Sequence, residues 1–309
     1  MLKSICSSIN KFVSDVIDKI TDRQPWYKYY SNCGKLEYPN LTIYELIAKT
    51  CDSYPNYYAF EYFGRKITYK EFLFKIKKTA SSLLELGVKE GDRVTICMPN
   101  TPVAVITFYA LNMIGATASM IHPLSSENEI EFYLNESNSK YILTIDLVYN
   151  KIAKVVDKTK VEKIIVSSVS DDMNEIKRVF YWFLSGRKIK IEKTDKVIFY
   201  NDLMKLGLYY KEFESCKRKL DDEAVILYSG GTTGNPKGII LTNRNFNALA
   251  MQCHLVCEPN KAGDSILAIL PIFHGFGLGV SIHTPLYAGL KVILVRLCWM
   301  CSGRKCIRN

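Results

Sequence analysis

Eleven consecutive residues, from Tyr228 to Gly238, hold the groups in this chain that are best suited to chemistry: Y-S-G-G-T-T-G-N-P-K-G. Glycine has no Cβ, so the backbone N–H groups of such a loop can surround an anion. The two threonine hydroxyls add hydrogen-bond donors, and Lys237 adds a mobile positive charge. The pattern predicts a phosphate-binding loop. The alternative is a glycine-rich hairpin turn whose lysine has no ligand.

Two common phosphate motifs are excluded for this loop. A Walker loop has serine or threonine directly after its lysine, whereas here Pro236 precedes Lys237 and Gly238 follows it. The dinucleotide pattern G-x-G-x-x-G is also not met. The loop lies between two short apolar runs, 224–227 and 239–241, which predict a strand on each side.

A second block, L-P-I-F-H-G-F-G-L at 270–278, places His274 in an apolar stretch. A histidine in such surroundings is either a core residue or a binding residue. Its position downstream of the phosphate loop favours binding, so His274 is a candidate site residue.

Both blocks resemble motifs of the adenylate-forming superfamily, which includes acyl-CoA synthetases, luciferases and the adenylation domains of peptide synthetases. The first block resembles the signature loop Y-S-S/G-G-T-T-G-x-P-K-G, and the second resembles L-P-x-x-H-x-x-G. The resemblance covers most of the chain, from about residue 38 to about residue 295. Weaker matches lie upstream of both blocks, in the same order as in the family, at Ile67–Phe72, Gly87–Val94 and Asn112–Leu124.

The resemblance implies two half-reactions. A carboxylate oxygen attacks the α-phosphorus of ATP and pyrophosphate leaves; a thiol, usually that of CoA, then attacks the acyl-adenylate. The implied catalytic residues are His274, Lys237 and Thr232. The implied nucleotide-binding residues are Ser229, Gly230, Gly231, Thr232, Thr233, Gly234 and Lys237. ATP, Mg²⁺ and CoA are the implied cofactors and co-substrates, and no metal ligand is assigned in this chain.

The acid that would be activated is expected to be a medium- to long-chain fatty acid. The opening Trp26-Tyr27 resembles fatty acyl-CoA synthetases. Three glycines are expected to leave room beside His274 for the acid: Gly275, Gly277 and Gly279. Three apolar residues are expected to line its acyl end: Phe273, Phe276 and Leu278. Aryl acids and amino acids stay open as alternatives.

Stretches with helical periodicity alternate along the chain with short apolar runs, which predicts an α/β fold. The expected helices are 72–86 and 103–114, and the expected strands include 94–98, 141–143 and 163–166. With the resemblance, the expected fold is an incomplete N-terminal domain of an adenylate-forming enzyme, with mostly parallel sheets flanked by helices. Ligands of such sheets bind at the carboxyl ends of the strands.

The expected domains are an N-terminal amphipathic helix and lead-in (1–35), a first α/β subdomain (36–220) with an insertion near 171–195, the start of a second α/β subdomain (221–295), and an aberrant tail (296–309). The later motifs of the family are not found in these 309 residues. We therefore expect a truncated, inactive ligase fragment, produced by a frameshift, premature stop or gene-model error near Val295. The alternatives are a non-catalytic remnant that binds nucleotide or acyl ligand, and a phosphate-binding regulatory module, which the His274 block disfavours.

Net charge and cysteine content limit the kinds of binding partner and the compartment that we expect for this chain. The formal net charge of +10 suits nucleotide, CoA or a membrane surface, but no basic run with interleaved aromatics predicts nucleic-acid binding. Ten scattered cysteines without a signal peptide or spanning segment predict reduced thiols in a cytoplasmic protein. The pair Cys298 and Cys301 has no second pair at zinc-binding spacing.

Two segments leave peripheral membrane contact open as an alternative. The first twenty residues carry an apolar stripe at helical spacing, which predicts either a helix packed on the body or one lying on a bilayer. The apolar run 179–184 precedes a basic cluster at 186–190 and predicts either a surface excursion or a bilayer contact.

Overall fold

The structure is a computed structural model that describes residues 11–13, 15–16, 36–173, 191, 194–207, 215–230, 236–256 and 261–295. The chain divides into two compact units, Met1–Glu37 and Tyr38–Asn309. In the first unit residues 11–13 and 15–16 are helical, as the sequence predicts for this segment, and Phe12, Val13 and Val16 are exposed. The rest of this account concerns the second unit.

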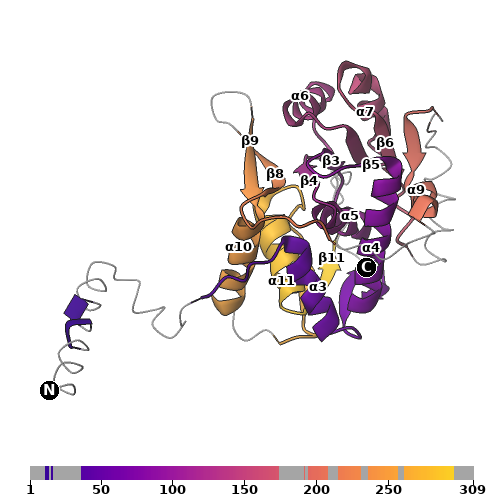
Figure 1. The fold of residues 1–309 in the computed structure, drawn as a ribbon. Helices are drawn as coiled ribbons and strands as arrows, with labels where there is room; N and C mark the ends of the chain where they lie inside the picture. Colours follow the sequence, from indigo (N-terminus) through magenta and orange to yellow (C-terminus); the bar gives the residue numbers. More distant parts are fainter. Residues whose placement is uncertain are drawn as a thin grey trace, which may run out of the picture. The chain divides into compact units, whose positions relative to one another are not determined.

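A seven-stranded sheet forms the larger layer of this unit, in the order β7-β6-β5-β3-β4-β8-β9 (Figure 1). All neighbouring strands are parallel except β8 and β9, which form an antiparallel pair. The strands are β3 (Arg93–Cys97), β4 (Thr117–Met120), β5 (Tyr141–Ile145), β6 (Lys163–Ser167), β7 (Val197–Phe199), β8 (Glu223–Ser229) and β9 (Lys237–Thr242).

A four-stranded sheet forms the second layer, in the order β10-β11-β1-β2. It joins the two ends of the unit, because β1 from the start pairs in parallel with β11 from the end. The strands are β1 (Tyr58–Tyr62), β2 (Arg65–Thr68), β10 (Ser265–Ala268) and β11 (Lys291–Leu294).

Helices flank both sheets (Figure 1). Three of them begin at a serine or threonine whose side chain and the glutamate three residues later cap each other: Thr42 with Glu45, Thr68 with Glu71, and Ser126 with Glu129. The helices are α3 (Ile43–Ser53), α4 (Tyr69–Leu86), α5 (Pro102–Met113), α6 (Glu127–Ser137), α7 (Tyr149–Val155), α9 (Tyr200–Leu206), α10 (Asn243–Val256) and α11 (Thr284–Tyr287), with a 3₁₀ turn η1 (Val156–Lys158) and a π-helix η4 (Phe276–His283).

The α5 helix is the centre of the core, since all twelve of its residues are buried. It is apolar on every side, as expected of a helix with no solvent face. Segments far apart in sequence meet around it. The Tyr69 hydroxyl on α4 donates to the Leu290 carbonyl over 2.8 Å, and the Asn112 side chain on α5 donates to Asn243 of α10 over 2.8 Å.

The predicted α/β class, the two long helices and the named strands are confirmed. The strands β8 and β9, which fall in the predicted second subdomain, lie in the same sheet as β3–β7. The reason is that β8 pairs directly with β4, which sequence spacing could not show. The predicted domain boundaries stay predictions, and most of 171–195 and all of 296–309 lie outside the described residues. Over the described part of the chain, no helix has both the length and the apolar character to cross a membrane.

Candidate functional site

The β8–β9 hairpin carries the predicted phosphate loop. Ser229 and Lys237 face each other as the last residue pair of the hairpin, and residues 230–236 connect them. Ser229 is half-buried and Gly230 is exposed, and apart from the chain neighbours of Gly230 no atom of the described residues lies within 4 Å of the position of a Cβ on it. The central residues 231–235 lie outside the described residues, so the roles of Gly231, Thr232, Thr233 and Gly234 stay predictions.

Lys237 is exposed at the start of β9, the outermost strand of the sheet. It forms no ion pair with any carboxylate of the described residues. Its ammonium therefore carries a charge that no described residue neutralises, beside a loop mouth that is open at Gly230. This is the arrangement that an anionic ligand needs.

Tyr228 anchors the base of the hairpin. Its hydroxyl lies 3.1 Å from the Ser119 hydroxyl of β4, and its ring lies 4.3 Å from that of Tyr133 on α6. Burial raises the pKa of the Tyr228 phenol, so it stays neutral. A Cβ on Gly238, which faces Tyr228 across the hairpin, would lie 3.2 Å from this ring. The tyrosine and the last glycine of the motif are therefore architectural.

His274 lies in an exposed turn between β10 and η4. Its backbone N–H donates to the Pro271 carbonyl over 3.0 Å, and its Nδ1 accepts from the Phe276 N–H over 3.2 Å. Because Nδ1 is an acceptor, the neutral ring carries its proton on Nε2. The free side of the imidazole can thus donate one hydrogen bond to an anionic or carbonyl oxygen.

Asn100, three residues after the end of β3, holds the backbone of this turn, and the sequence analysis missed it. Its Nδ2 donates to the Ala268 and Leu270 carbonyls over 3.1 and 2.9 Å, and its Oδ1 accepts from the Ile272 N–H over 2.8 Å. The side chain is buried and uses its donors and its acceptor on a segment about 170 residues away. The only sequence signal was a polar residue two positions after the predicted strand 94–98.

The expectation that three glycines leave room for an acid is wrong for two of them. A Cβ on Gly277 would lie 1.9 Å from the Pro271 carbonyl oxygen, and one on Gly279 would lie 2.6 Å from a methyl group of Leu249. Protein atoms already occupy both spaces, because η4 packs tightly on the turn and on α10. Leu278 is likewise buried in the core, while Phe276 is exposed.

Gly275 connects the two motifs. A Cβ there would lie at ordinary contact distance, 3.4 Å, from Leu227 of β8. Leu227 is two residues before Ser229, where the phosphate loop begins. The structure therefore brings the His274 turn beside the strand that carries the phosphate loop.

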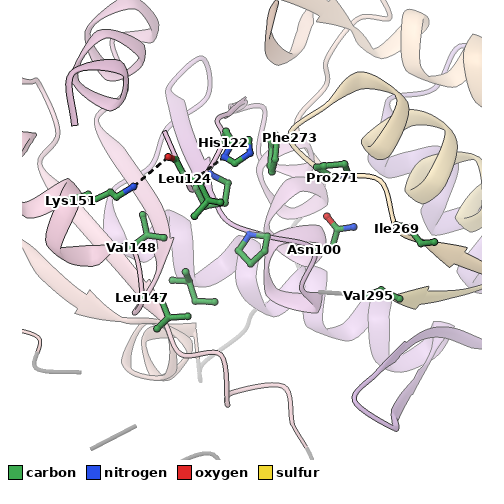
Figure 2. Close-up of a pocket in the computed structure, with 13 residues that line it drawn as sticks. Asn100, His122, Leu124, Leu147, Val148, Lys151, Ile269, Pro271, Phe273 and Val295 are labelled. Atoms are coloured by element: carbon green, nitrogen blue, oxygen red, sulfur yellow. Dashed lines mark hydrogen bonds between the residues drawn. The ribbon is translucent and has the colours of Figure 1, made fainter. Parts of the chain in front are cut away.

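A cavity of about 300 Å³ opens at the carboxyl ends of β3, β4 and β5 (Figure 2). Parallel sheets commonly bind ligands at this edge. Its far wall comes from the segments after β10 and β11, so both sheets contribute. The lining residues are Pro99, Asn100, His122, Pro123, Leu124, Ile145, Leu147, Val148, Lys151, Ile269, Pro271, Phe273 and Val295.

Two of these residues give the mainly apolar cavity polar character. The Lys151 ammonium donates to the Ser125 carbonyl over 3.1 Å. It also donates to the Leu124 carbonyl over 3.4 Å, as Figure 2 shows. The centroids of the His122 and Phe273 rings lie 4.3 Å apart with the rings tilted by 53°, and burial lowers the pKa of His122, which favours its neutral form. The cavity can thus take a ligand with an apolar body and a negative group.

His283, at the end of η4, holds that helix against α5 and α10. Its Nδ1 accepts from the Tyr109 hydroxyl over 3.1 Å, and its Nε2 donates to the Asn247 Oδ1 over 3.2 Å. Asn247 in turn donates to the Leu41 carbonyl over 2.7 Å, which orients its amide. Complete burial lowers the pKa of His283 to about 3, so the ring is neutral at physiological pH.

Comparison with known proteins identifies one enzyme family. Residues 47–299 match the family model of the AMP-binding enzymes. The long-chain-fatty-acid–CoA ligase of Bacillus subtilis is 31% identical over 281 residues, which are 88% of this chain and 50% of that protein. The enzyme of that name from Haemophilus influenzae is 26% identical over 283 residues, 87% of this chain and 50% of that protein.

The fold agrees with that of a solved relative. The crystal structure of a long-chain-fatty-acid–CoA ligase from Archaeoglobus fulgidus superposes with a TM-score of 0.68 at 25% identity, covering 85% of this chain and 48% of that one. The chain therefore spans about half the length of the relatives it matches.

Proposed function

Since this chain belongs to the family of AMP-binding enzymes, we propose that it forms the phosphate-binding part of an ATP-dependent fatty acid–CoA ligase. The observation that carries the proposal is the closeness of Gly275 to Leu227, since a Cβ on Gly275 would lie 3.4 Å from the Leu227 side chain; the His274 turn thus lies beside the strand that leads into the phosphate loop. One motif would hold the leaving phosphates of ATP, and the other would border the carboxylate that attacks the α-phosphorus.

The chemistry follows from charge. A carboxylate oxygen bonds to the α-phosphorus as the bond to pyrophosphate breaks; a thiol, in our proposal that of CoA, then takes the acyl group and releases AMP. The protein mainly positions the reactants and stabilises phosphate charge. Lys237 and the loop donors Ser229, Thr232 and Thr233 would bind the β- and γ-phosphates. His274 would donate from Nε2 to the carboxylate.

The described residues are better suited to binding the phosphates of a nucleotide than to binding its Mg²⁺ ion. The open backbone at Gly230 and the exposed Lys237 suit phosphate. Mg²⁺ would neutralise phosphate oxygens when bound, but the described residues contain no cluster of three or more candidate ligands. We therefore assign no side chain to the metal and derive no step through it.

The cavity at the strand ends would take part of an amphiphilic substrate, because its walls are apolar and Lys151 adds a positive charge. The fatty acid and CoA both have this character. Leu147→Trp would fill the cavity, so its effect separates the two: weaker fatty-acid binding assigns the cavity to the acyl chain, and weaker CoA binding assigns it to the thiol arm. Unchanged affinity for both substrates contradicts this role of the cavity.

We further propose that the 309 residues assayed alone bind ATP but do not complete the reaction, because they span about half of the relatives' length. The alternative is a remnant that binds ligand without any catalytic contribution. Equilibrium dialysis with ATP and ATP–pyrophosphate exchange with a panel of fatty acids test both steps. Exchange by the chain alone would overturn the proposed inactivity, and the absence of ATP binding would overturn the proposed function.

The variant Lys237→Ala tests the proposed phosphate contact directly. The loss of one charge-assisted contact to phosphate should weaken ATP binding by about 1.5–3 kcal/mol and leave fatty-acid binding unchanged. Lys217→Ala is the matched control, because Lys217 is also exposed and forms no ion pair with the described residues. Equal losses of ATP affinity in the two variants would remove Lys237 from the phosphate site.

A further inference from the structure

A hollow of about 490 Å³ lies between the end of α3 and the first turns of α4. None of the residues that line this α3–α4 hollow lines the cavity at the strand ends. The hollow also lies apart from the phosphate hairpin, since Figure 1 shows α3 near the bottom of this unit and β9 at its upper left. Small-molecule sites have volumes of about 300–1,000 Å³, so the hollow has room for a mononucleotide.

Backbone hydrogen bonds hold the two walls of the hollow together. The Lys70 N–H donates to the Pro55 carbonyl over 3.0 Å, and the Tyr69 N–H donates to the Tyr57 carbonyl over 2.9 Å. These bonds tie the turn after α3 to the start of α4. Cys51, which also lines the hollow, is buried, and burial raises the pKa of its thiol to about 12, so the thiol is neutral. The hollow is therefore formed before any ligand binds.

Two lysines give the hollow a positive charge. Lys70 and Lys77 line it from α4, and neither forms an ion pair with a carboxylate of the described residues. The Glu71 carboxylate, next to Lys70 in the sequence, accepts from the Thr68 N–H over 2.8 Å. Among the residues that line the hollow, Asp52 alone carries a negative charge. The ammonium groups outnumber it, which suits a phosphate ligand.

An aromatic ring stands between the two lysines. Lys70, Phe74 and Lys77 are spaced by four and three residues, so they share one face of α4. Phe74 is 60% exposed, and such a ring can stack on any nucleobase. On the wall after α3, the Asn56 amide can bond to a base edge, and the Asp52 carboxylate can accept from ribose hydroxyls.

We propose that the α3–α4 hollow binds a nucleoside phosphate, with its base on Phe74 and its phosphates on Lys70 and Lys77. An aliphatic acid would meet the ring and the ammonium groups but would offer no donor to Asp52 or Asn56. The site shares no residue with the phosphate hairpin, so ATP binds this chain at two separate places.

The variant Phe74→Trp places a fluorescent reporter in the hollow. ATP should quench the added indole, because the base stacks on it, with the parent chain as the background for Trp26, Trp182 and Trp299. Leu206→Trp is the matched reporter, since Leu206 is 43% exposed at the end of α9 and does not line the hollow. Its fluorescence should not change with ATP.

Charge variants made in the Phe74→Trp chain test the phosphate contacts. Lys70→Gln with Lys77→Gln should weaken ATP binding, measured by quenching, on the order of tenfold or more. Lys217→Gln with Lys219→Gln removes two exposed lysines outside the hollow and should stay within about twofold. Lys237→Ala should also leave the quenching unchanged, so failure of the proposed phosphate loop and failure of this site are separate results.

Parts of the nucleotide show whether both halves of the site are used. Adenosine and tripolyphosphate should each bind at least about tenfold more weakly than ATP, because each keeps only the base or only the charge. The proposal would be overturned by the absence of ATP quenching, by quenching that survives the Lys70/Lys77 change, or by tripolyphosphate binding as tightly as ATP. Quenching by decanoate in place of ATP would also overturn it, in favour of an aliphatic acid.

Discussion

Replacement of Asn100 should expose how strongly one side chain holds the His274 turn. Its amide makes three hydrogen bonds, to the Ala268 and Leu270 carbonyls and from the Ile272 N–H, at 3.1, 2.9 and 2.8 Å. Each bond contributes about 1 kcal/mol net, and a buried group left without a partner costs about 1–3 kcal/mol. Asn100→Ala should therefore lower the free energy of unfolding by about 3–4 kcal/mol, a large share of the 5–15 kcal/mol typical of a domain.

The nearly isosteric variant Asn100→Asp separates hydrogen bonding from packing. An ionised aspartate still accepts from the Ile272 N–H, but it directs a negative oxygen at two carbonyls that had received hydrogen bonds. The loss should equal or exceed that of the alanine variant at neutral pH, although the number of heavy atoms is unchanged. Urea unfolding monitored by circular dichroism measures both values, and amide exchange at Ile272 reports the turn itself.

Asn135→Asp is the control for the change from amide to acid. Asn135 is exposed and makes one long bond, 3.4 Å, to the Lys158 carbonyl. The free energy of unfolding of the Asn135→Asp variant should differ from that of the parent chain by no more than about 0.5 kcal/mol. If Asn100→Asp were as stable as the parent chain, the turn would not depend on the donors of Asn100, and the reasoning would fail.

Three further predictions concern the core and its charges. Gly277→Ala should cost about 2–3 kcal/mol because the added methyl meets a carbonyl oxygen, whereas Gly275→Ala, with its nearest atom at 3.4 Å, should be nearly neutral in urea unfolding. The pKa of His283 is lowered to about 3, so its stabilising effect is complete above pH 6.5 and is lost as the pH falls toward 3. The parent chain should therefore lose roughly 2 kcal/mol more than His283→Gln between pH 7 and pH 5, and equal slopes of stability against pH would contradict this. Arg93 holds the pKa of Glu223 below its usual range, so Glu223→Gln should be less stable than the parent chain above that range, with the difference vanishing as the pH falls through the lowered pKa. A difference that persisted at low pH would point to lost packing instead.

Local patterns in the sequence decided much of the fold. The helical period of 72–86 predicted a helix, and α4 covers this segment, beginning at Tyr69 after a capping box formed by Thr68 and Glu71. The alternation of apolar runs and helical periods gave the α/β class, and the strand–loop–strand reading of 224–241 is confirmed by β8 and β9. These features depend on neighbours within a few residues, so spacing and residue type are enough to predict them.

Contacts between distant segments decided the rest, since spacing along the chain does not say which strands become neighbours. Pairing of β8 with β4 put the phosphate hairpin in the first sheet, and pairing of β1 with β11 joined the two ends of the unit. The sequence analysis expected Gly277 to leave room for the acid. Only the packing showed that the Pro271 carbonyl, and not a ligand, occupies the space beside its Cα. Asn100 and Lys151 could not be assigned to a site from their local sequence, because the carbonyls they bind and the cavity they line come from segments that meet only in the folded chain.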